Sequence, residues 1–461
     1  MKFAKVPSSY RDPSGFVFFQ NGKVFRRVNV SYKQNFDLLI KSGLYKKLVD
    51  AGLLVAHKEV NFKDRESLAY KHLQPQFIPF ISYPYEWCFS QLKDAALLTL
   101  KIQKIALEHG MSLKDATSYN VQFLEGKPIF IDTLSFEKYT PGNPWVAYKQ
   151  FCEHFLAPLA VYAYKDVRLN TVMQAHAGTI PLDLAAKLLP ASAKLKPSLL
   201  VHLFFHAGSQ KKYSEATLIK KPKKSFGKGA FIGIIDSLEG AVKGLKLKTS
   251  KTVWTNYYDP SDKGSYRDES LARKKELVAK FIDLAKPKSL WDLGANTGVY
   301  SEIAAAKGVF TVSSDNDHTV VEQNYLRIKK NGEKNILPLW VDIANPTPAL
   351  GWENTEREAF LQRPKPDTVL ALALIHHLAI SNNIPISRLA SMLSKSCKTL
   401  IIEFIPKEDY RVKLLLQSRE DIFADYNQNT FEKEFGKFFS KVKKVQLTNS
   451  QRTLYLLKRK N

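Results

Sequence analysis

Apolar positions in the C-terminal half of the chain switch repeatedly between strand-like and helix-like spacing. The segment 269–286 places Leu271, Leu277, Val278, Phe281 and Ile282 on one helical face, and Pro287 ends it. Short apolar runs then alternate with amphipathic segments, and the runs cover 289–293, 309–314, 336–342, 367–374 and 398–405. This rhythm predicts a parallel, doubly wound α/β sheet with helices on both faces. The last segment, 442–460, predicts two strands joined by a polar turn, which adds an antiparallel hairpin to the sheet.

The N-terminal half mixes both spacings without this regular alternation. Residues 15–30 predict two strands with Asn21 and Gly22 as the hairpin turn, and residues 90–110 predict a long helix. The stretch that follows is rich in lysine, glycine and serine, which favours a linker. We therefore expect an α+β domain over 1–207, a lysine-rich linker over 208–250 and the α/β domain over 251–461.

Composition narrows the class of protein. The 461 residues include 69 Lys and Arg against 44 Asp and Glu, a formal net charge of +25, so the chain could attract a polyanion by bulk electrostatics. The three cysteines, Cys88, Cys152 and Cys397, form no pattern typical of a disulfide framework or a zinc site. With no apolar run of a signal peptide or a membrane span, we expect a soluble cytoplasmic protein.

A glycine-rich turn from Asp292 to Gly298 lies between the first predicted strand of the α/β domain and the helix after it. Gly294, Asn296 and Gly298 suit a tight turn that a ligand can approach closely. Their spacing does not match the G-x-G-x-x-G fingerprint of dinucleotide binding. Asp292 would repel a pyrophosphate but attract a ligand that carries an ammonium and a sulfonium, as S-adenosylmethionine does.

Acidic residues also end the next two predicted strands. Asp315 stands where an acid accepts hydrogen bonds from ribose hydroxyls in such sheets. Asp342 is a candidate acceptor for the exocyclic amine of adenine, with Val341 packing on the ring. Each acid alone could equally form a turn or cap a helix. Three acids at successive strand ends indicate one cofactor site.

These segments resemble the ordered motifs of class I S-adenosylmethionine-dependent methyltransferases. The matching stretches are DLGANTG, SSDND, LWVDI, DTVLALALIHHL and KTLIIEFI, although Asn296 replaces a glycine that is common in that class. Other stretches, among them PALGWENTE and SREDIFADYNQNTFE, are similar to the bacterial group named after nodulation protein NoeA. The resemblance covers roughly residues 250–461. It implies a Rossmann-like fold, a methyltransferase activity and a cofactor site formed by Asp292, Gly294, Gly298, Asp315 and Asp342.

Candidate catalytic groups follow the fourth and fifth predicted strands. His376 and His377 come directly after the strand at 367–374, and a histidine can accept a proton near neutral pH. In an extended segment their side chains would point to opposite sides, so one at most would face a substrate. Glu403 is the second candidate acid–base or substrate-orienting group, and its alternative role is an ion pair with Lys407 or Arg411.

A second pattern occurs in the N-terminal half. Asp115 and Asn120, followed by Asp132 at a predicted strand end, resemble the catalytic loop and metal-binding aspartate of kinase-like phosphotransferases. The resemblance implies a base at Asp115 and two Mg²⁺ ligands at Asn120 and Asp132. A glycine-rich loop and the usual Asp-Phe-Gly are missing, so a degenerate scaffold that recognises substrate is the alternative to an active enzyme.

The leading hypothesis is an S-adenosylmethionine-dependent methyltransferase that acts on an oxygen or nitrogen of an unidentified acceptor. A small molecule or saccharide is favoured, with RNA or protein as alternatives. The rival hypotheses are an RNA-binding protein or RNA methyltransferase driven by the basic charge, and a bifunctional protein with an N-terminal phosphotransferase. No metal is expected outside that kinase-like site, and the oligomeric state is left open.

Overall fold

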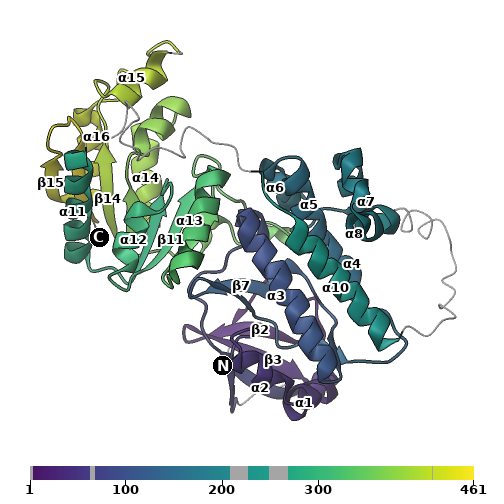
Figure 1. The fold of residues 1–461 in the computed structure, drawn as a ribbon. Coiled ribbons are helices and arrows are strands. Elements are labelled where there is room, and N and C mark those ends of the chain that lie inside the picture. The colour runs from purple at the N-terminus through teal and green to yellow at the C-terminus, as the bar shows by residue number, and fades with distance from the viewer. Residues whose placement is uncertain (1–3, 63–67, 208–226, 249–267, 418, 461) are drawn as a thin grey trace. The chain divides into compact units, whose positions relative to one another are not determined.

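Two compact units make up the chain. The computed structural model describes residues 4–62, 68–207, 227–248, 268–417 and 419–460 (Figure 1). The N-terminal unit comprises Met1–Lys248 and Ala349–Glu358, and the C-terminal unit comprises Thr249–Pro348 and Ala359–Asn461. The predicted domain 251–461 is therefore not continuous, because ten of its residues belong to the N-terminal unit. None of the described helices is long and apolar enough to cross a bilayer.

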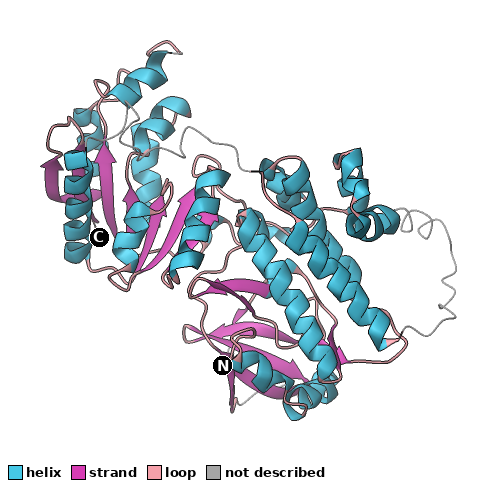
Figure 2. Cartoon of the chain, in the orientation of Figure 1, coloured by secondary structure: helices cyan, strands magenta, loops and turns pink. Residues whose placement is uncertain are grey.

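An antiparallel sheet with the strand order β1-β2-β3-β5-β4 opens the N-terminal unit (Figure 2). The predicted hairpin joins β2 to β3, and Asn21 and Gly22 both have positive φ, as a two-residue turn of this kind requires. The strands of the unit are β1 (Ala4–Lys5), β2 (Gly15–Gln20), β3 (Lys23–Asn29), β4 (His57–Val60), β5 (Ala69–Pro75), β6 (Met111–Leu113), β7 (Val121–Leu124), β8 (Lys127–Phe130) and β9 (Phe136–Lys138). Its helices are α1 (Lys33–Lys41), α2 (Leu44–Asp50), α3 (Phe89–Glu108), α4 (Tyr148–Phe151), α5 (Ala157–Tyr164), α6 (Asn170–Ala175), α7 (Leu182–Leu188), α8 (Pro197–Leu199) and α10 (Lys228–Gly244).

The prediction of a linker over 208–250 is wrong for the part of this range that forms helix α10. This helix packs along α3 and buries Phe231, Ile235, Leu238 and Val242, which recur at helical spacing. Lys93 on α3 donates to the carbonyl oxygens of Lys243 and Leu245 at 3.0 and 2.7 Å, which satisfies the C-terminal end of α10. The lysine and glycine content of this stretch concealed its apolar period. The lysine-rich residues 208–226 lie outside the described ranges.

The C-terminal unit contains a seven-stranded sheet with the order β12-β11-β10-β13-β14-β16-β15. The first five strands in this order run parallel, and β16 is antiparallel to both β14 and β15. The predicted terminal hairpin is thereby confirmed. The strands are β10 (Ser289–Leu293), β11 (Phe310–Asp315), β12 (Ile336–Trp340), β13 (Thr368–Ala371), β14 (Thr399–Phe404), β15 (Phe439–Gln446) and β16 (Thr453–Arg459), and the helices are α11 (Asp268–Ala285), α12 (Val299–Ala305), α13 (His318–Asn331), α14 (Ile386–Ser396), α15 (Tyr410–Gln417) and α16 (Gln428–Gly436).

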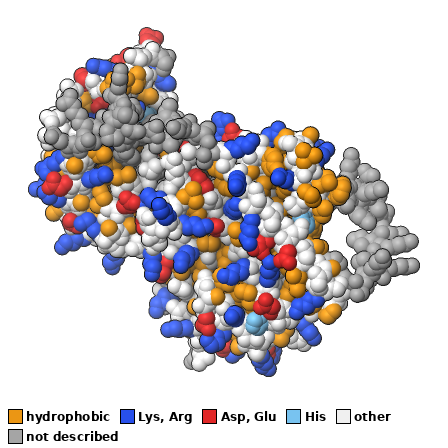
Figure 3. All heavy atoms as spheres, in the orientation of Figure 1, with side chains coloured by type: hydrophobic (Ala, Val, Ile, Leu, Met, Phe, Trp, Pro, Cys, Tyr) orange, Lys and Arg blue, Asp and Glu red, His pale blue; other side chains and the backbone are white. Residues whose placement is uncertain are grey.

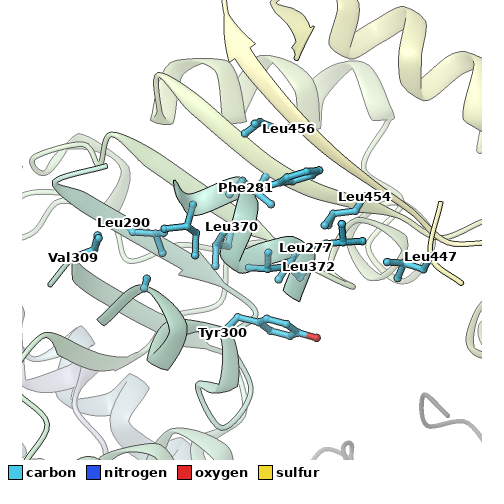
Figure 4. Packing of buried hydrophobic residues seen from close by; sticks show 14 residues of the cluster. Leu277, Phe281, Leu290, Tyr300, Val309, Leu370, Leu372, Leu447, Leu454 and Leu456 are labelled. Carbon is cyan, nitrogen blue, oxygen red and sulfur yellow. The ribbon is translucent and has the colours of Figure 1, made fainter. Parts of the chain in front are cut away.

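Helices cover both faces of this sheet. On one face, apolar residues of α11 and α12 pack over a row of strand residues that includes Leu370, Ile401 and Leu456 (Figure 4). On the other face, Phe431 of α16 packs against Phe404 and Tyr455. Because both faces are covered, the edge formed by the carboxyl ends of the parallel strands is where a ligand can enter.

Candidate functional site

The turn between β10 and α12 has the conformation that its glycines predict. Gly294, Asn296 and Gly298 all have positive φ, at 73°, 52° and 83°. The backbone N–H of Gly294 donates to the carbonyl oxygen of Ser314 on β11 at 2.9 Å. A Cβ atom on Gly298 would lie 2.6 Å from the side-chain amide of Asn324, so this position needs glycine for space as well as for conformation.

Asp292 is buried directly beneath this turn, with 1% of its surface exposed. Its carboxylate accepts a hydrogen bond from Ser301 Oγ on α12 at 2.7 Å. Burial raises the pKa of Asp292 to about 7; the Ser301 hydrogen bond opposes this shift, and the nearby charge of Asp315 adds to it. The charge of Lys274 favours ionisation of this carboxylate, but the effect of burial is larger.

Asp315 lies at the end of β11 and faces the same turn. Its carboxylate accepts the backbone N–H groups of Asn296 at 2.8 Å and Asp317 at 2.9 Å. Burial raises its pKa to about 6, and these backbone hydrogen bonds limit the shift. Asp317 caps α13, because its side chain accepts a hydrogen bond from the Thr319 N–H at 2.7 Å. Asp315 therefore does not have the helix-capping role that was its alternative.

Asp342 follows β12, the neighbouring strand. The N–H of Val341 donates to the Asp315 carbonyl oxygen at 2.9 Å, which holds the third strand end next to the second. One carboxylate oxygen of Asp342 accepts the Ala344 N–H at 2.9 Å, and Val341 is buried. The carboxyl ends of β10, β11 and β12 thus bring the three predicted acids to one edge of the sheet.

A buried polar network under the turn escaped the sequence analysis. Ser301 Oγ lies 2.9 Å from Ser313 Oγ, and Asn324 Nδ2 donates to Ser313 Oγ at 2.9 Å. All three side chains are at most 2% exposed. Ser313 and Ser314 inside the predicted strand 309–314 were the available signal, because a buried polar side chain needs a partner. Through Ser301 this network fixes the orientation of the Asp292 carboxylate.

Planar groups adjoin Asp315 as well. The rings of His318 and Trp340 stack with centroids 4.7 Å apart and an interplanar angle of 6°. Trp340 Nε1 donates to the Asn316 carbonyl oxygen at 2.9 Å, so the indole is fixed beside the strand end. Sequence analysis did not single out either residue.

The two histidines after β13 lie in a helical turn, and the expectation of an extended segment is wrong. His376 has φ −66° and ψ −33°, and His377 begins a π-helical turn, η10 (His377–Ser381). Their rings therefore lie side by side, 4.0 Å between centroids, instead of on opposite sides. His376 is 1% exposed, whereas His377 is partly exposed. Burial lowers the pKa of His376 far below its usual value and that of His377 to about 4, so both rings are neutral at pH 7.

Glu403 is fully buried and forms an ion pair with Lys274, a partner that the sequence did not suggest. Lys274 of α11 donates to its carboxylate at 2.6 Å, and both side chains are at most 2% exposed. The same carboxylate oxygen accepts the Ala373 N–H at 2.8 Å, and Ala373 has a φ of 50°, which is uncommon outside glycine. Lys407 instead pairs with Asp421. Glu403 thus holds the turn that leads to the histidines.

The kinase-like residues of the N-terminal unit are only partly brought together. Asn120 Nδ2 donates to Ser135 Oγ at 3.2 Å, and Ser135 Oγ donates to Asp132 Oδ2 at 2.5 Å. Asp115 Oδ1 accepts the Thr117 N–H and forms a local turn. Asp132 Oδ1 forms an ion pair with Arg26 of β3 and also accepts the Leu134 N–H. A cation of the chain thus occupies the place that the resemblance gives to Mg²⁺, and among the described residues no cluster of three or more His, Cys, Asp or Glu could hold a metal.

Comparison with known proteins gives one relative over nearly the whole length. Nodulation protein NoeA of Rhizobium meliloti (strain 1021) is 34% identical over 469 aligned positions, which span 99% of this chain and 96% of the relative. The chain belongs to the NoeA family. A scan of protein-family models gives no match for this NoeA-family chain.

Solved structures overlap with part of the chain. Magnesium protoporphyrin IX methyltransferase of Synechocystis PCC 6803 with bound S-adenosylhomocysteine is 16% identical and covers 45% of this chain and 93% of its own, with a TM-score of 0.31. The N-methyltransferase NodS of Bradyrhizobium japonicum WM9 is 10% identical over 42% of this NoeA-family chain and 98% of its own, with a TM-score of 0.31. These scores are low, so the interpretation of the site rests on the residues of the chain itself.

Proposed function

We propose that the C-terminal unit is a methyltransferase that binds S-adenosylmethionine at the carboxyl ends of β10, β11 and β12. One observation carries the proposal: Asp292 is buried and Asp315 is partly buried at the same turn, and neither carboxylate accepts a hydrogen bond from a Lys or Arg among the described residues. Their raised pKa values show that each carboxylate lacks full compensation for its charge. A ligand with an ammonium and a sulfonium supplies that compensation.

The residues fit this cofactor class in other respects. Asp315 has its carboxylate at the end of the second strand, where ribose hydroxyls would donate to it. Val341 and the partly exposed Ile343 flank Asp342 and would contact the adenine, and the ring pair of His318 and Trp340 adjoins the same edge. The positive φ angles of Gly294, Asn296 and Gly298 make the turn tight, which lets its backbone approach a ligand closely.

S-adenosylmethionine supplies a methyl group that is already activated on a sulfonium, so the protein contributes mainly alignment. His377 is the better placed of the two histidines to accept a proton from an acceptor hydroxyl or amine, because it is partly exposed whereas His376 is buried. His376 packs behind it. Glu403 acts as a positioning residue, since Lys274 and Ala373 N–H already occupy its carboxylate.

Calorimetric titration of the purified protein with S-adenosylhomocysteine tests the cofactor assignment. We expect saturable binding with one site per chain. Incubation with radiolabelled S-adenosylmethionine and an extract from a strain that lacks the protein tests the reaction, and label should enter an acceptor fraction. Absence of binding in the first experiment would refute the proposal.

Fewer observations support the two alternative functions, an RNA acceptor and a phosphotransferase. Lys and Arg side chains are spread among acidic and apolar ones over the face drawn in Figure 3, and the lysine-rich run 208–226 lies outside the described residues. An RNA acceptor therefore stays a prediction, to be tested by label in the RNA fraction. The ion pair of Arg26 with Asp132 argues against Mg²⁺-dependent phosphotransfer at the kinase-like residues.

A further inference from the structure

A groove of about 360 Å³ opens beside the histidine turn of the C-terminal unit. One wall is formed by Ala379, which lies in the same π-helical turn as His377, and by Ile384, whose N–H donates to the Leu378 carbonyl oxygen at 3.1 Å. The other wall is formed by the segment 422–426. Tyr426 at its end donates a hydrogen bond to the carbonyl oxygen of Ile405, the residue after β14, at 2.7 Å. Both walls are therefore attached to the carboxyl ends of β13 and β14.

The lining of this groove combines apolar side chains with hydrogen-bond acceptors. Ile422 is 66% exposed although it is a large aliphatic residue, and Phe423 lies beside it. Asp425 and Glu434 are the charged side chains of the lining, and no Lys or Arg is among the described residues that line it. Glu434 pairs with Lys437, whereas the Asp425 carboxylate has neither a hydrogen bond nor an ion pair with any described residue. Arg419, outside the lining, donates to the Ile380 carbonyl oxygen at 2.5 Å and to Oδ1 of the lining residue Asn383 at 3.4 Å.

We propose that this groove binds the methyl acceptor, and that the acceptor is a small neutral or cationic molecule with an apolar face and a hydroxyl or amino group. The inference rests on the proposed function, because it needs a methyl donor at the neighbouring strand ends. The volume suits a small molecule or part of a larger one. Covering an exposed apolar surface with a ligand is favourable. The Asp425 carboxylate can accept a hydrogen bond from a donor group of that ligand. A polyanionic acceptor such as RNA would bring phosphates against Asp425 without a cation in the lining to offset the repulsion.

Three fragments of similar size test the preference: 2-phenylethylamine, 2-phenylethanol and 3-phenylpropionate. Each is added to the full chain saturated with S-adenosylhomocysteine, and binding is measured by saturation-transfer NMR and titration. We expect the amine to bind most tightly, the alcohol next, and the carboxylate at least tenfold more weakly than the amine.

Three substitutions locate the fragments. D425K should weaken amine binding at least tenfold, whereas E420K makes the same charge change on the same segment outside the lining and should alter it less than twofold. A424W fills the groove and should abolish binding of all three fragments. S-adenosylhomocysteine affinity should stay within twofold in all three variants, which also shows that they fold.

The outcomes separate this inference from the proposed function. If S-adenosylhomocysteine binds but the fragments do not, or if the carboxylate binds as tightly as the amine, the acceptor assignment is overturned and the cofactor assignment stands. Fragment binding that survives A424W would place the fragments elsewhere and overturn it as well. If S-adenosylhomocysteine does not bind to the wild-type chain, the proposed function itself fails.

Discussion

Two aspartates after predicted strands have opposite electrostatic states in the two units. Asp292 in the C-terminal unit is buried with a raised pKa and without a hydrogen bond to a Lys or Arg among the described residues. Asp132 in the N-terminal unit is 15% exposed and forms an ion pair with Arg26. If a buried carboxylate is neutralised by the chain itself, removing it leaves its partner's charge uncompensated, whereas a carboxylate that is only partly compensated is poised for a cationic ligand. An acid at a strand end is therefore a structural residue where the chain supplies its counter-charge, and a candidate ligand-binding residue where the chain does not.

The largest expected effect is on cofactor affinity when the charge of Asp292 is removed. D292N keeps the size of the side chain and an oxygen that can accept from Ser301. Loss of a charge-assisted interaction costs about 1.5–3 kcal/mol, so S-adenosylhomocysteine should bind roughly 10- to 150-fold more weakly. Calorimetric titration at pH 7.5 measures the change. An affinity within twofold of the wild type would remove Asp292 from the site.

The matched substitution in the other unit should change stability instead of affinity. D132N leaves Arg26 without its counter-charge, and we expect the N-terminal unit to lose roughly 2–3 kcal/mol. Hydrogen exchange of peptides that cover β3 and β8 measures this loss separately from the C-terminal unit. S-adenosylhomocysteine affinity should be unchanged. A D132N variant of normal stability that also turned over ATP would reverse the interpretation of this aspartate.

A smaller effect is expected at the glycine turn. G298A introduces a Cβ at 2.6 Å from Asn324 at a φ of 83°, whereas G332A at a φ of 69° has nothing within 4 Å. Left-handed backbone strain of about 1–2 kcal/mol is common to both variants, so the difference between their stabilities measures the clash with Asn324. We expect G298A to lower both thermal stability and S-adenosylhomocysteine affinity, and G332A to lower stability alone. Equal affinities in the two variants would contradict the role of the turn.

The last comparison concerns the pH dependence of stability. The pKa values of Asp292 and Asp315 are raised in the folded chain, to about 7 and about 6, so the folded state binds their protons more tightly than the unfolded state. Their contribution to stability is therefore present at low pH and is lost as the pH rises from about 4 to about 7. Hydrogen exchange in β10 and β11 between pH 5 and 8, corrected for intrinsic rates, should show this decline, and D292N should reduce it by roughly 1 kcal/mol or more.

Periodicity alone predicted most of the C-terminal unit. The five parallel strands and the terminal hairpin follow from short apolar runs, and the glycine turn follows from its spacing. Helix α10 was missed because composition was weighed above the spacing of Phe231, Ile235 and Leu238. The partner of Glu403 was unpredictable, since Lys274 is 129 positions away and meets it only through packing of α11 on the sheet.

The histidine turn shows a similar limit. Adjacent histidines after a strand predict opposite directions only if the backbone remains extended, and here it enters a π-helical turn. The sequence pattern also gave no sign that residues 349–358 belong to the N-terminal unit. Its Arg357 guanidinium lies 3.7 Å from the ring centroid of Tyr119, a contact between positions far apart in the sequence.

Proton release on binding tests the central claim most directly. If the carboxylates of Asp292 and Asp315 are partly protonated in the free protein and ionise against a cationic ligand, S-adenosylmethionine binding at pH 6.5 must release protons. Calorimetry in buffers of different ionisation enthalpy measures their number. We predict release of between about half a proton and one proton at pH 6.5, falling toward zero at pH 8.5 and reduced in D292N. Binding with no proton release at pH 6.5, or with uptake, would contradict the account.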